Sequence, residues 1–435
     1  MTSDRKQSTT IIDGQYKGIP PLIGDIPIEE IGRQGWSLLK GDLPLPAAII
    51  RESALQQNSR WMRRFLEYSG ALLCPHGKTT MSPQLFKRQI DDGSWGITIS
   101  TVQQLCVARR HGIKRILMAN QLVGIVEIRY VVDELARDPE FDFFCIVDSI
   151  DGVKRLSDAA REGLSVRPLQ VLVEGGYQGG RTGCRTVEEA LRVAREVRRA
   201  YPHLALCGVE GYEGTLLSSE ASEIDTAERV RDFVKYLNTI ATSCYEERLF
   251  SEGPVLLSAG GSAFYDVVAE SFSKARLGGR QKVVLRSGCY LTHDIGIYKK
   301  LDEAVRRRLS NCEDLGPGPV PALEVWTYVQ SAPESNLVIL TAGRRDCGHD
   351  AGLPVPLKRF RPRCDDAPVQ LSSDFKVIGL NDQHAYLQTP APDFLRVGDM
   401  VALGISHPCT TFDKWRILFI VNDDYRVGSA IETFF

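Results

Sequence analysis

The sequence has no long apolar run and no excess of charge of one sign, and both absences limit what the protein can do. No stretch approaches the roughly 20 consecutive apolar residues that a membrane-spanning helix needs. The 435 residues carry 53 basic and 55 acidic side chains, so a formal charge of −2 provides no field that would attract a phosphate backbone or an anionic lipid surface. We therefore expect small-molecule ligands, with neither nucleic acid nor membrane among the partners.

Paired cysteine motifs and a leader segment are also missing. None of the 11 cysteines lies in a CxxC pair, and an odd number scattered along a chain is typical of reduced cysteines in a cytosolic protein. The first ten residues, MTSDRKQSTT, are polar and lack the apolar segment of a secretion signal. These features predict a cytoplasmic location. The length and a hydrophobic fraction of 43% suffice for two or three domains with large cores.

Residues 70–290 alternate short apolar or β-branched runs with longer amphipathic ones, which is the pattern of β/α units. The predicted strands are Ala71–Cys74, Gly96–Ser100, Arg115–Ala119, Phe143–Val147, Gln170–Glu174, Leu204–Val209, Val255–Ala259 and Val283–Arg286. Eight strands with intervening helices, such as the one expected over Val187–Ala200, favour a closed (β/α)8 barrel of the TIM type over an open sheet. We expect this barrel to span residues 51–305.

A second domain is predicted after the barrel. The helical periodicity ends near residue 310, at the Pro- and Gly-rich segment DLGPGPVPA. Runs of alternating character follow it: ALEVWTYVQ, NLVILTAG, FKVIGL, HAYLQ, DMVALGI and WRILFIV. They predict a mainly antiparallel β domain over residues 306–435. Residues 1–50, which include the apolar run PAAII, could complete this domain.

The segment CPHGKTT follows the first predicted strand and contains Lys78. Because active sites of such barrels lie at the carboxyl ends of the strands, Lys78 is expected at the mouth of the barrel. A partly desolvated lysine has a lowered pKa and can form a Schiff base. Position alone leaves open the alternative that Lys78 is an ordinary exposed loop lysine.

Two glycine-rich segments follow later strands. SAGGS, residues 258–262, ends the seventh strand, and its free N–H groups and hydroxyls could bind a phosphate or simply form a tight turn. EGGYQGGRTG, residues 174–183, follows the fifth strand, and its Arg181 suits a phenolate or carboxylate unless the loop is a flexible surface loop. Tyr212, after the sixth strand, is either a site residue or a packed tyrosine.

The segment SHPCTT in the β domain contains His407 and Cys409. In an extended segment residues i and i+2 share a face, so the imidazole and the thiolate could bind one metal, and this donor pair favours zinc. Two protein ligands would leave positions for water or substrate, as in an open catalytic site. The alternative is chance spacing beside a core cysteine. His384, in the upstream DQH segment, is a candidate acid or base near the metal.

Taken in order, these motifs resemble those of the D-threonine aldolase and D-serine dehydratase family, a branch of the fold-type III pyridoxal phosphate enzymes related to alanine racemase. The likeness runs from about Ile23 to Ile431 and includes CPHGKTTMSP, VLVEGGYQGGRTG, SAGGS, RSGCYLTHD, DQHAYL and SHPC. It implies Lys78 as the Schiff-base lysine, Arg181 near the cofactor phenolate, and His407 with Cys409 as metal ligands. The residues that it implies for the phosphate are Ser258, Gly260, Gly261 and Ser262, and His76 and Tyr212 complete the predicted cofactor-binding set.

The resemblance implies a pyridoxal phosphate- and zinc-dependent lyase that eliminates water from D-β-hydroxy amino acids such as D-serine or D-3-hydroxyaspartate. A His-x-Cys pair is similar to that of the zinc-dependent dehydratases of the family. One alternative is retro-aldol cleavage to glycine and an aldehyde with Mn²⁺ or Mg²⁺, as in D-threonine aldolase. Another is a protein that carries pyridoxal phosphate without turnover, although such a carrier would not need the β domain. We also expect a homodimer.

Overall fold

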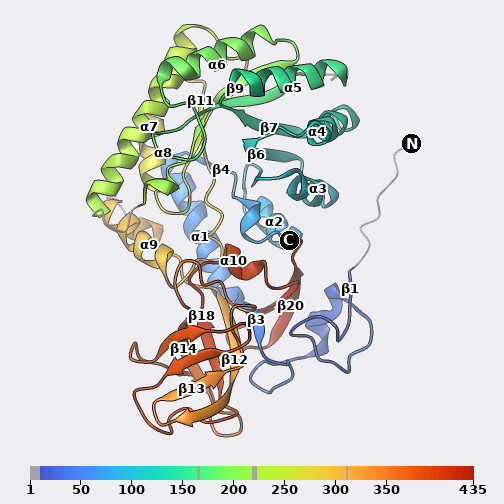
Figure 1. The fold of residues 1–435 in the computed structure, drawn as a ribbon, viewed down its shortest axis with the longest axis vertical. Coiled ribbons are helices and arrows are strands. Elements are labelled where there is room, and N and C mark those ends of the chain that lie inside the picture. The colour runs from blue at the N-terminus through green and yellow to red at the C-terminus, as the bar shows by residue number, and fades with distance from the viewer. Residues whose placement is uncertain (1–9, 164–166, 218–222, 310–311) are drawn as a thin grey trace.

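The computed structural model describes residues 10–163, 167–217, 223–309 and 312–435. Figure 1 shows a ring of strands wrapped by helices in its upper half and a β domain in its lower half. The short strands β1 (Ile11–Ile12) and β2 (Ile26–Pro27) and the 3-10 helix η1 (Ile28–Gln34) lie beside the β domain. The short helix α10 (Cys409–Phe412) lies between the two halves.

Eight parallel strands form the ring, in the order β4-β11-β10-β9-β8-β7-β6-β5. Their bounds are β4 (Leu72–Leu73), β5 (Ile97–Ile99), β6 (Arg115–Gln121), β7 (Asp142–Val147), β8 (Leu169–Gly175), β9 (Leu204–Gly211), β10 (Val255–Ala259) and β11 (Gln281–Leu285). The ring closes between β4 and β5, where the N–H groups of Trp95 and Thr98 donate to the carbonyls of Leu73 and Pro75 over 2.7 and 2.9 Å. The predicted (β/α)8 barrel is confirmed, and every predicted strand overlaps one of these.

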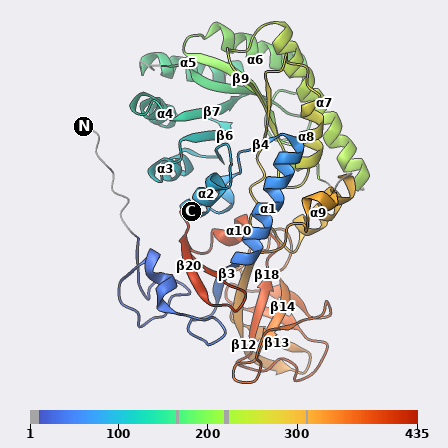
Figure 2. The same cartoon turned by 180° about the vertical axis from the view of Figure 1, so that it is seen from behind.

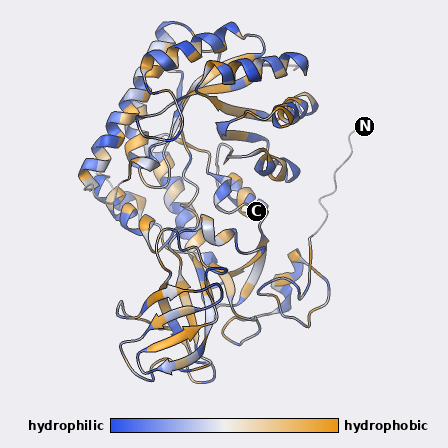
Figure 3. Ribbon diagram, in the orientation of Figure 1, coloured by the Kyte–Doolittle hydropathy of each residue, from blue (hydrophilic) through white to orange (hydrophobic). Residues whose placement is uncertain are grey.

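Helices lie around the outside of the ring, as Figures 1 and 2 show from opposite sides. They are α1 (Glu52–Ser69), α2 (Pro83–Asp91), α3 (Val102–Arg110), α4 (Ile125–Arg137), α5 (Ile150–Glu162), α6 (Val187–Arg199), α7 (Glu223–Glu246), α8 (Tyr265–Ser273) and α9 (Ile297–Arg308). In Figure 3 the strands are largely hydrophobic and the helices carry hydrophilic outer faces, as expected of a parallel sheet that is covered. Within the described ranges, no helix is long and apolar enough to cross a membrane.

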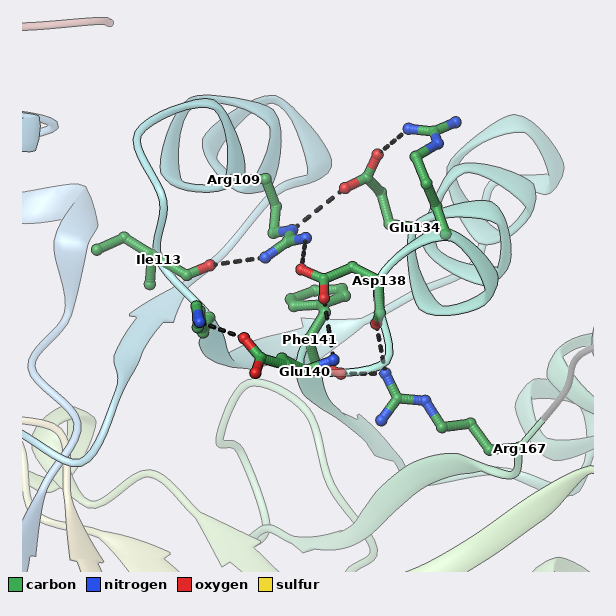
Figure 4. Close-up of polar contacts among 9 residues, drawn as sticks. Arg109, Ile113, Glu134, Asp138, Glu140, Phe141 and Arg167 are labelled. Atoms are coloured by element: carbon green, nitrogen blue, oxygen red, sulfur yellow. Dashed lines mark hydrogen bonds and ion pairs between the residues drawn. The ribbon is translucent and has the colours of Figure 1, made fainter. Parts of the chain in front are cut away.

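A largely buried arginine ties α3 to α4 and to the turn that leads into β7, as Figure 4 shows. Arg109 Nε donates to Glu134 Oε2 over 3.2 Å, and Nη2 donates to Asp138 Oδ2 over 2.6 Å. Nη1 donates to the Ile113 carbonyl over 3.0 Å, and the guanidinium carbon lies 4.0 Å from the centre of the Phe141 ring. This one side chain therefore joins three consecutive segments of the barrel wall.

The β domain is built on a sheet with the strand order β15-β14-β18-β12-β13-β17-β16. Its strands are β12 (Leu323–Glu334), β13 (Leu337–Leu340), β14 (Val355–Phe360), β15 (Val369–Gln370), β16 (Lys376–Leu380), β17 (Ala385–Gln388), β18 (Met400–Gly404), β19 (Ile417–Val421) and β20 (Val427–Glu432). From the N-terminal region, β3 (Ala47–Arg51) pairs with β12 and β19, and β19 pairs with β20. Each run predicted for this domain overlaps one of these strands.

Helix α1 joins the two halves, because β3 leads directly into it. Asn58 of α1 is fully buried, and its Nδ2 donates to the carbonyls of Leu291 and Val320 over 2.8 and 2.9 Å. Its Oδ1 accepts the Val320 N–H over 2.7 Å. Leu291 follows the last barrel strand and Val320 precedes the first long strand of the β domain. These hydrogen bonds therefore hold the barrel and the β domain together. As a result α10 lies against the 3-10 helix η2 (Gly77–Thr79), just after β4.

Candidate active site

A cavity of about 480 Å³ lies where the carboxyl ends of the barrel strands face α10. Of the residues singled out from the sequence, those that line it are His76, Lys78, Arg181, Tyr212, Gly261, Ser262, His407 and Cys409. The barrel residues follow β4, β8, β9 and β10, and the other two lie at the start of α10. Candidates from separate segments of the chain therefore meet at one place.

Lys78 lies in η2, the short turn that follows β4. Gly288 passes close to this turn, since a Cβ there would lie 2.6 Å from the His76 carbonyl oxygen and 2.7 Å from the Thr79 hydroxyl. Lys78 projects into the open cavity, where partial loss of water lowers its pKa from the usual 10.5, and the guanidinium of Arg181 lowers this pKa further. A larger share of neutral amine suits Lys78 to Schiff-base formation.

His76 forms the wall beside Lys78. Its Nε2 lies 3.1 Å from Ser100 Oγ, while its Nδ1 is buried and has no hydrogen-bond partner in the described structure. Burial and the neighbouring Lys78 hold the pKa of His76 well below the usual 6.5, so the ring is neutral. A buried nitrogen without a hydrogen-bond partner is unusual in a protein interior, which sets the His76 ring apart from an ordinary packed histidine.

Arg181 lies in the glycine-rich loop after β8, and this loop has a defined shape. The guanidinium of Arg185 donates to four consecutive carbonyls, those of residues 180–183, over 2.6 to 3.1 Å. The Arg181 guanidinium carbon lies 4.8 Å from the centre of the Tyr212 ring. Four bonds from one side chain argue against a flexible surface loop and hold Arg181 at the cavity.

The SAGGS turn after β10 is only partly available to a ligand. Gly261 and Ser262 line the cavity. The N–H groups of Gly260 and Gly261, however, donate to the Glu213 carboxylate over 3.1 and 2.6 Å. Gly260 is not among the residues that line the cavity, and a protein carboxylate takes the N–H groups of both glycines that the sequence assigned to a phosphate.

Ser258 also lies outside the cavity wall. It is fully buried within β10, and its Oγ donates to the Val284 carbonyl over 3.1 Å. The predicted strand Val255–Ala259 coincides with β10, so Ser258 is a strand residue and the turn begins only after Ala259. A phosphate at this end would depend on Ser262 and its neighbours, because the Gly261 N–H is bonded to Glu213.

A buried ion pair that was not among the candidate site residues adjoins the cavity. Arg286, just after β11, lines the cavity and forms an ion pair with Glu210 of β9. Its Nη2 also donates to the Gly211 carbonyl over 2.7 Å. The side chains of Arg286 and Glu210 are only 6% and 1% exposed, so the pair is part of the barrel interior. Both residues stand at or just after the ends of predicted barrel strands, and a charged residue at that place is the feature of the sequence by which the pair could have been found.

His407 and Cys409 line the cavity from the side of the β domain. Pro408 between them has helical dihedrals, φ −59° and ψ −48°, so the pair lies in a turn entering α10. The expectation of an extended segment is wrong, although both side chains reach the same cavity. Cys409 Sγ lies 3.7 Å from Cys289 Sγ and 3.5 Å from Thr79 Oγ1.

The thiol and the imidazole stabilise each other's charged forms. Hydrogen bonds from Cys289 and His407 hold the pKa of Cys409 well below the usual 9.0. The Cys409 thiolate, aided by the carboxylate of Asp350, raises the pKa of His407 to about 9. A thiolate beside an imidazole is a donor set that suits zinc. Across the described residues, no three or more His, Cys, Asp or Glu side chains are grouped so as to hold a metal, so a metal here would have two protein ligands.

The structure does not bring His384 to this cavity. It lies in the exposed turn between β16 and β17, where its carbonyl accepts the Asn381 N–H over 2.9 Å. The sequence order of the DQHAYL and SHPC segments suggested proximity, but β17 and β18 belong to different parts of the sheet. The position of His384 therefore does not support a role as acid or base at the metal.

The fold and the cavity define a class of protein, an alanine racemase-like barrel joined to a β domain, with a lysine after the first barrel strand. An alanine racemase-like protein from Idiomarina loihiensis superposes with a TM-score of 0.66 at 16% identity, over 90% of this chain and 96% of that one. D-threonine aldolase from Filomicrobium marinum superposes with a TM-score of 0.73 at 21% identity, over 92% of this chain and 97% of that one.

Sequence comparison is more specific for the β domain. Residues 322–421 match the family described as "Putative serine dehydratase domain". D-threo-3-hydroxyaspartate dehydratase from Delftia sp. (strain HT23) is 24% identical over 349 residues, which are 79% of this chain and 83% of that protein. The chain thus has the alanine racemase-like fold and carries a serine dehydratase-like domain, and the resemblance drawn from the motifs is confirmed.

Proposed function

We propose that the protein is a pyridoxal phosphate- and metal-dependent lyase that removes water from D-β-hydroxy amino acids and releases a 2-oxo acid and ammonia. The observation that carries the proposal is the placement of Lys78 and the His407–Cys409 pair on one cavity. The dehydratase from Delftia, similar over most of this chain, supports the choice of substrate class.

The chemistry of the cavity fits an anionic, planar cofactor. Arg181 and Arg286 are cationic, Arg286 within its ion pair with Glu210, while Lys78 offers an amine of lowered pKa and His76 a neutral ring. Lys78 would hold pyridoxal phosphate covalently, Arg181 would bind its phenolate, and the turn after β10 would bind its phosphate. When bound, the cofactor would supply an electron sink for the bond that breaks at the substrate α-carbon.

Once the substrate amine replaces it, the freed Lys78 amine would serve as the base. Partial burial lowers the pKa of Lys78, so a larger share of its Nζ is neutral and able to accept the α-proton of the substrate. Tyr212 and His76 line the same cavity. Cys409 lies against Thr79, the residue next to Lys78, so the base and the metal ligands face a single substrate.

Zinc is the metal that we propose for His407 and Cys409. It would polarise the β-hydroxyl of the substrate and assist its departure. Manganese and magnesium prefer oxygen ligands, which makes them less suited to an imidazole and a thiolate.

The proposal also assigns a task to each part of the chain. Residues 51–305 would bind the cofactor, and residues 306–435, together with 1–50, would supply the metal ligands. We propose that the protein works in the cytoplasm, as its scattered, unpaired cysteines indicate, and that it forms a homodimer.

Borohydride trapping tests the cofactor assignment. The purified protein, incubated with pyridoxal phosphate, is expected to absorb at the violet edge of the visible spectrum, and reduction should leave the cofactor attached to Lys78 in peptide mass spectra. Lys78→Ala and Lys78→Arg should lose the band and the label, since neither side chain offers a neutral amine. Lys114→Ala, which removes an exposed lysine, is the matched control. A label on another lysine, or none, would contradict the proposal.

A further inference from the structure

We infer that Asp350 is a positioning residue for His407, and that its carboxylate selects the imidazole nitrogen that faces the metal. Asp350 lies in the loop between β13 and β14 and belongs to none of the motifs discussed above. The inference rests on the proposed function, because it concerns the metal that this reaction would use.

The hydrogen bonds of Asp350 define the state of the His407 ring. Asp350 Oδ2 lies 2.6 Å from His407 Nδ1, and Asp350 Oδ1 accepts a hydrogen bond from Thr410 Oγ1 over 2.6 Å. An ionised carboxylate only accepts hydrogen bonds, so the proton of this contact is on Nδ1. Nε2 is then the nitrogen left to act as a metal ligand.

The loop that carries Asp350 is attached to the segment that carries both ligands. The Gly348 N–H donates to Thr411 Oγ1 over 2.9 Å, and Thr411 Oγ1 donates to the His407 carbonyl over 3.0 Å. Ser406 Oγ donates to the Gly352 carbonyl over 2.5 Å. These bonds lie on both sides of Asp350 in the sequence, so its carboxylate is held in place although its side chain is 51% exposed.

The packing at Gly348 supports the same conclusion. A Cβ at this position would lie 2.4 Å from Thr410 Oγ1 and 3.0 Å from the His407 carbonyl oxygen. The absence of a side chain lets the loop approach α10 closely enough for Asp350 to reach the ring. A surface ion pair with no role in the site would not require the loop to come this close to α10.

Carboxylates in this arrangement orient metal-binding imidazoles and increase their basicity. Loss of such a partner typically weakens metal binding by about 10 to 100-fold. The carboxylate, the imidazole and the thiolate would then act as one unit, with Asp350 outside the metal sphere. A surface role alone would leave metal affinity unchanged.

Zinc affinity measures this role without an activity assay. The cofactor-loaded protein is stripped of metal, and its zinc dissociation constant is determined by competition with a chromophoric chelator. We expect Asp350→Asn and Asp350→Ala to raise this constant by about 10 to 100-fold, and Thr410→Val to raise it less. Asp382→Asn removes a carboxylate that is 70% exposed and pairs with Arg345, and it should leave the constant unchanged.

The outcomes separate this inference from the proposed function. Wild-type zinc affinity in Asp350→Asn, with an unchanged melting temperature, would overturn the inference alone. A wild-type protein that binds no zinc would overturn both. Weakened zinc binding in Asp350→Asn, together with no turnover of D-β-hydroxy amino acids by the wild type, would support the inference and contradict the proposed function. Asp350→Asn is nearly isosteric, so the comparison survives if Asp350→Ala fails to fold.

Discussion

Lys78 Nζ is the atom on which the proposed chemistry depends, and its surroundings decide when it is neutral. Partial loss of water is the main cause that lowers its pKa below the usual 10.5. Only the neutral amine attacks an aldehyde, so the rate at which the cofactor-free protein takes up pyridoxal phosphate should rise with pH. We expect the midpoint of this rise below 10.5, measured by stopped-flow absorbance. Nα-acetyl-lysine with the same aldehyde is the control, and an equal midpoint for both would refute the effect of the cavity.

Cys409 has a different role, which can be separated from that of Lys78. Cys409→Ala should lower turnover of D-serine by at least about 100-fold, because a metal ligand is lost, while the cofactor absorbance remains. Treatment of the wild type with a chelator should have the same effect, and zinc should reverse it. Cys364→Ala, which removes an exposed thiol between β14 and β15, is the control. Full activity of the chelated, metal-free protein would reject the metal.

Single residues were predictable from the sequence where they follow a strand and carry a distinctive side chain. Lys78 and Arg181 satisfy both conditions. Arg185, Glu213 and Asp350 could not be found in this way, because their contacts are made to backbone or to side chains of other loops. Such contacts depend on the path of each loop in space, and the spacing of residues in the sequence does not predict that path.

At the scale of elements, the Arg109 network of Figure 4 offers a test of how the barrel wall is held together. The side chains of Arg109 and Glu134 are 10% and 8% exposed. Arg109→Ala would remove one of the two cationic partners of the buried Glu134 carboxylate, since Arg137 also pairs with it, and we expect it to lower the free energy of unfolding by about 1 to 3 kcal/mol. Arg110→Ala, the exposed neighbour on the same helix, should change it by less than about 0.5 kcal/mol. Urea unfolding measures both, and equal stabilities would contradict the role of the network.

The elements themselves follow closely from periodicity, and the exceptions have physical causes. Strand β14 has the sequence VPLKRF, whose lysine and arginine break the alternation expected of a strand. The structure buries Lys358 nevertheless, because its Nζ bonds Glu324 Oε1 over 2.6 Å and the Tyr425 hydroxyl over 2.7 Å. The partners of this buried charge are 34 and 67 residues away in the chain, so no local pattern reveals them.

At the scale of the whole molecule, the barrel and the β domain both contribute residues to the candidate site. Lys78 and Arg181 come from the barrel, and His407 and Cys409 come from the β domain. The contact of Cys409 with Thr79 brings the ligand pair against the turn that carries Lys78. A substrate between them would have to present its α-hydrogen to Lys78 and its β-hydroxyl to the metal at the same time. Only one enantiomer satisfies both requirements.

The products formed from separate enantiomers test the central claim most directly. The protein, loaded with pyridoxal phosphate and zinc, is incubated in turn with D-serine, D-threonine, D-3-hydroxyaspartate and the corresponding L-enantiomers, and ammonia, 2-oxo acid and glycine are assayed. The account predicts ammonia and a 2-oxo acid in equal amounts from at least one D-substrate, and little or no product from the L-enantiomers. Glycine as the dominant product would contradict the dehydratase assignment and indicate cleavage between the α- and β-carbons. Equal turnover of both enantiomers would contradict the account of a single base and a single metal site.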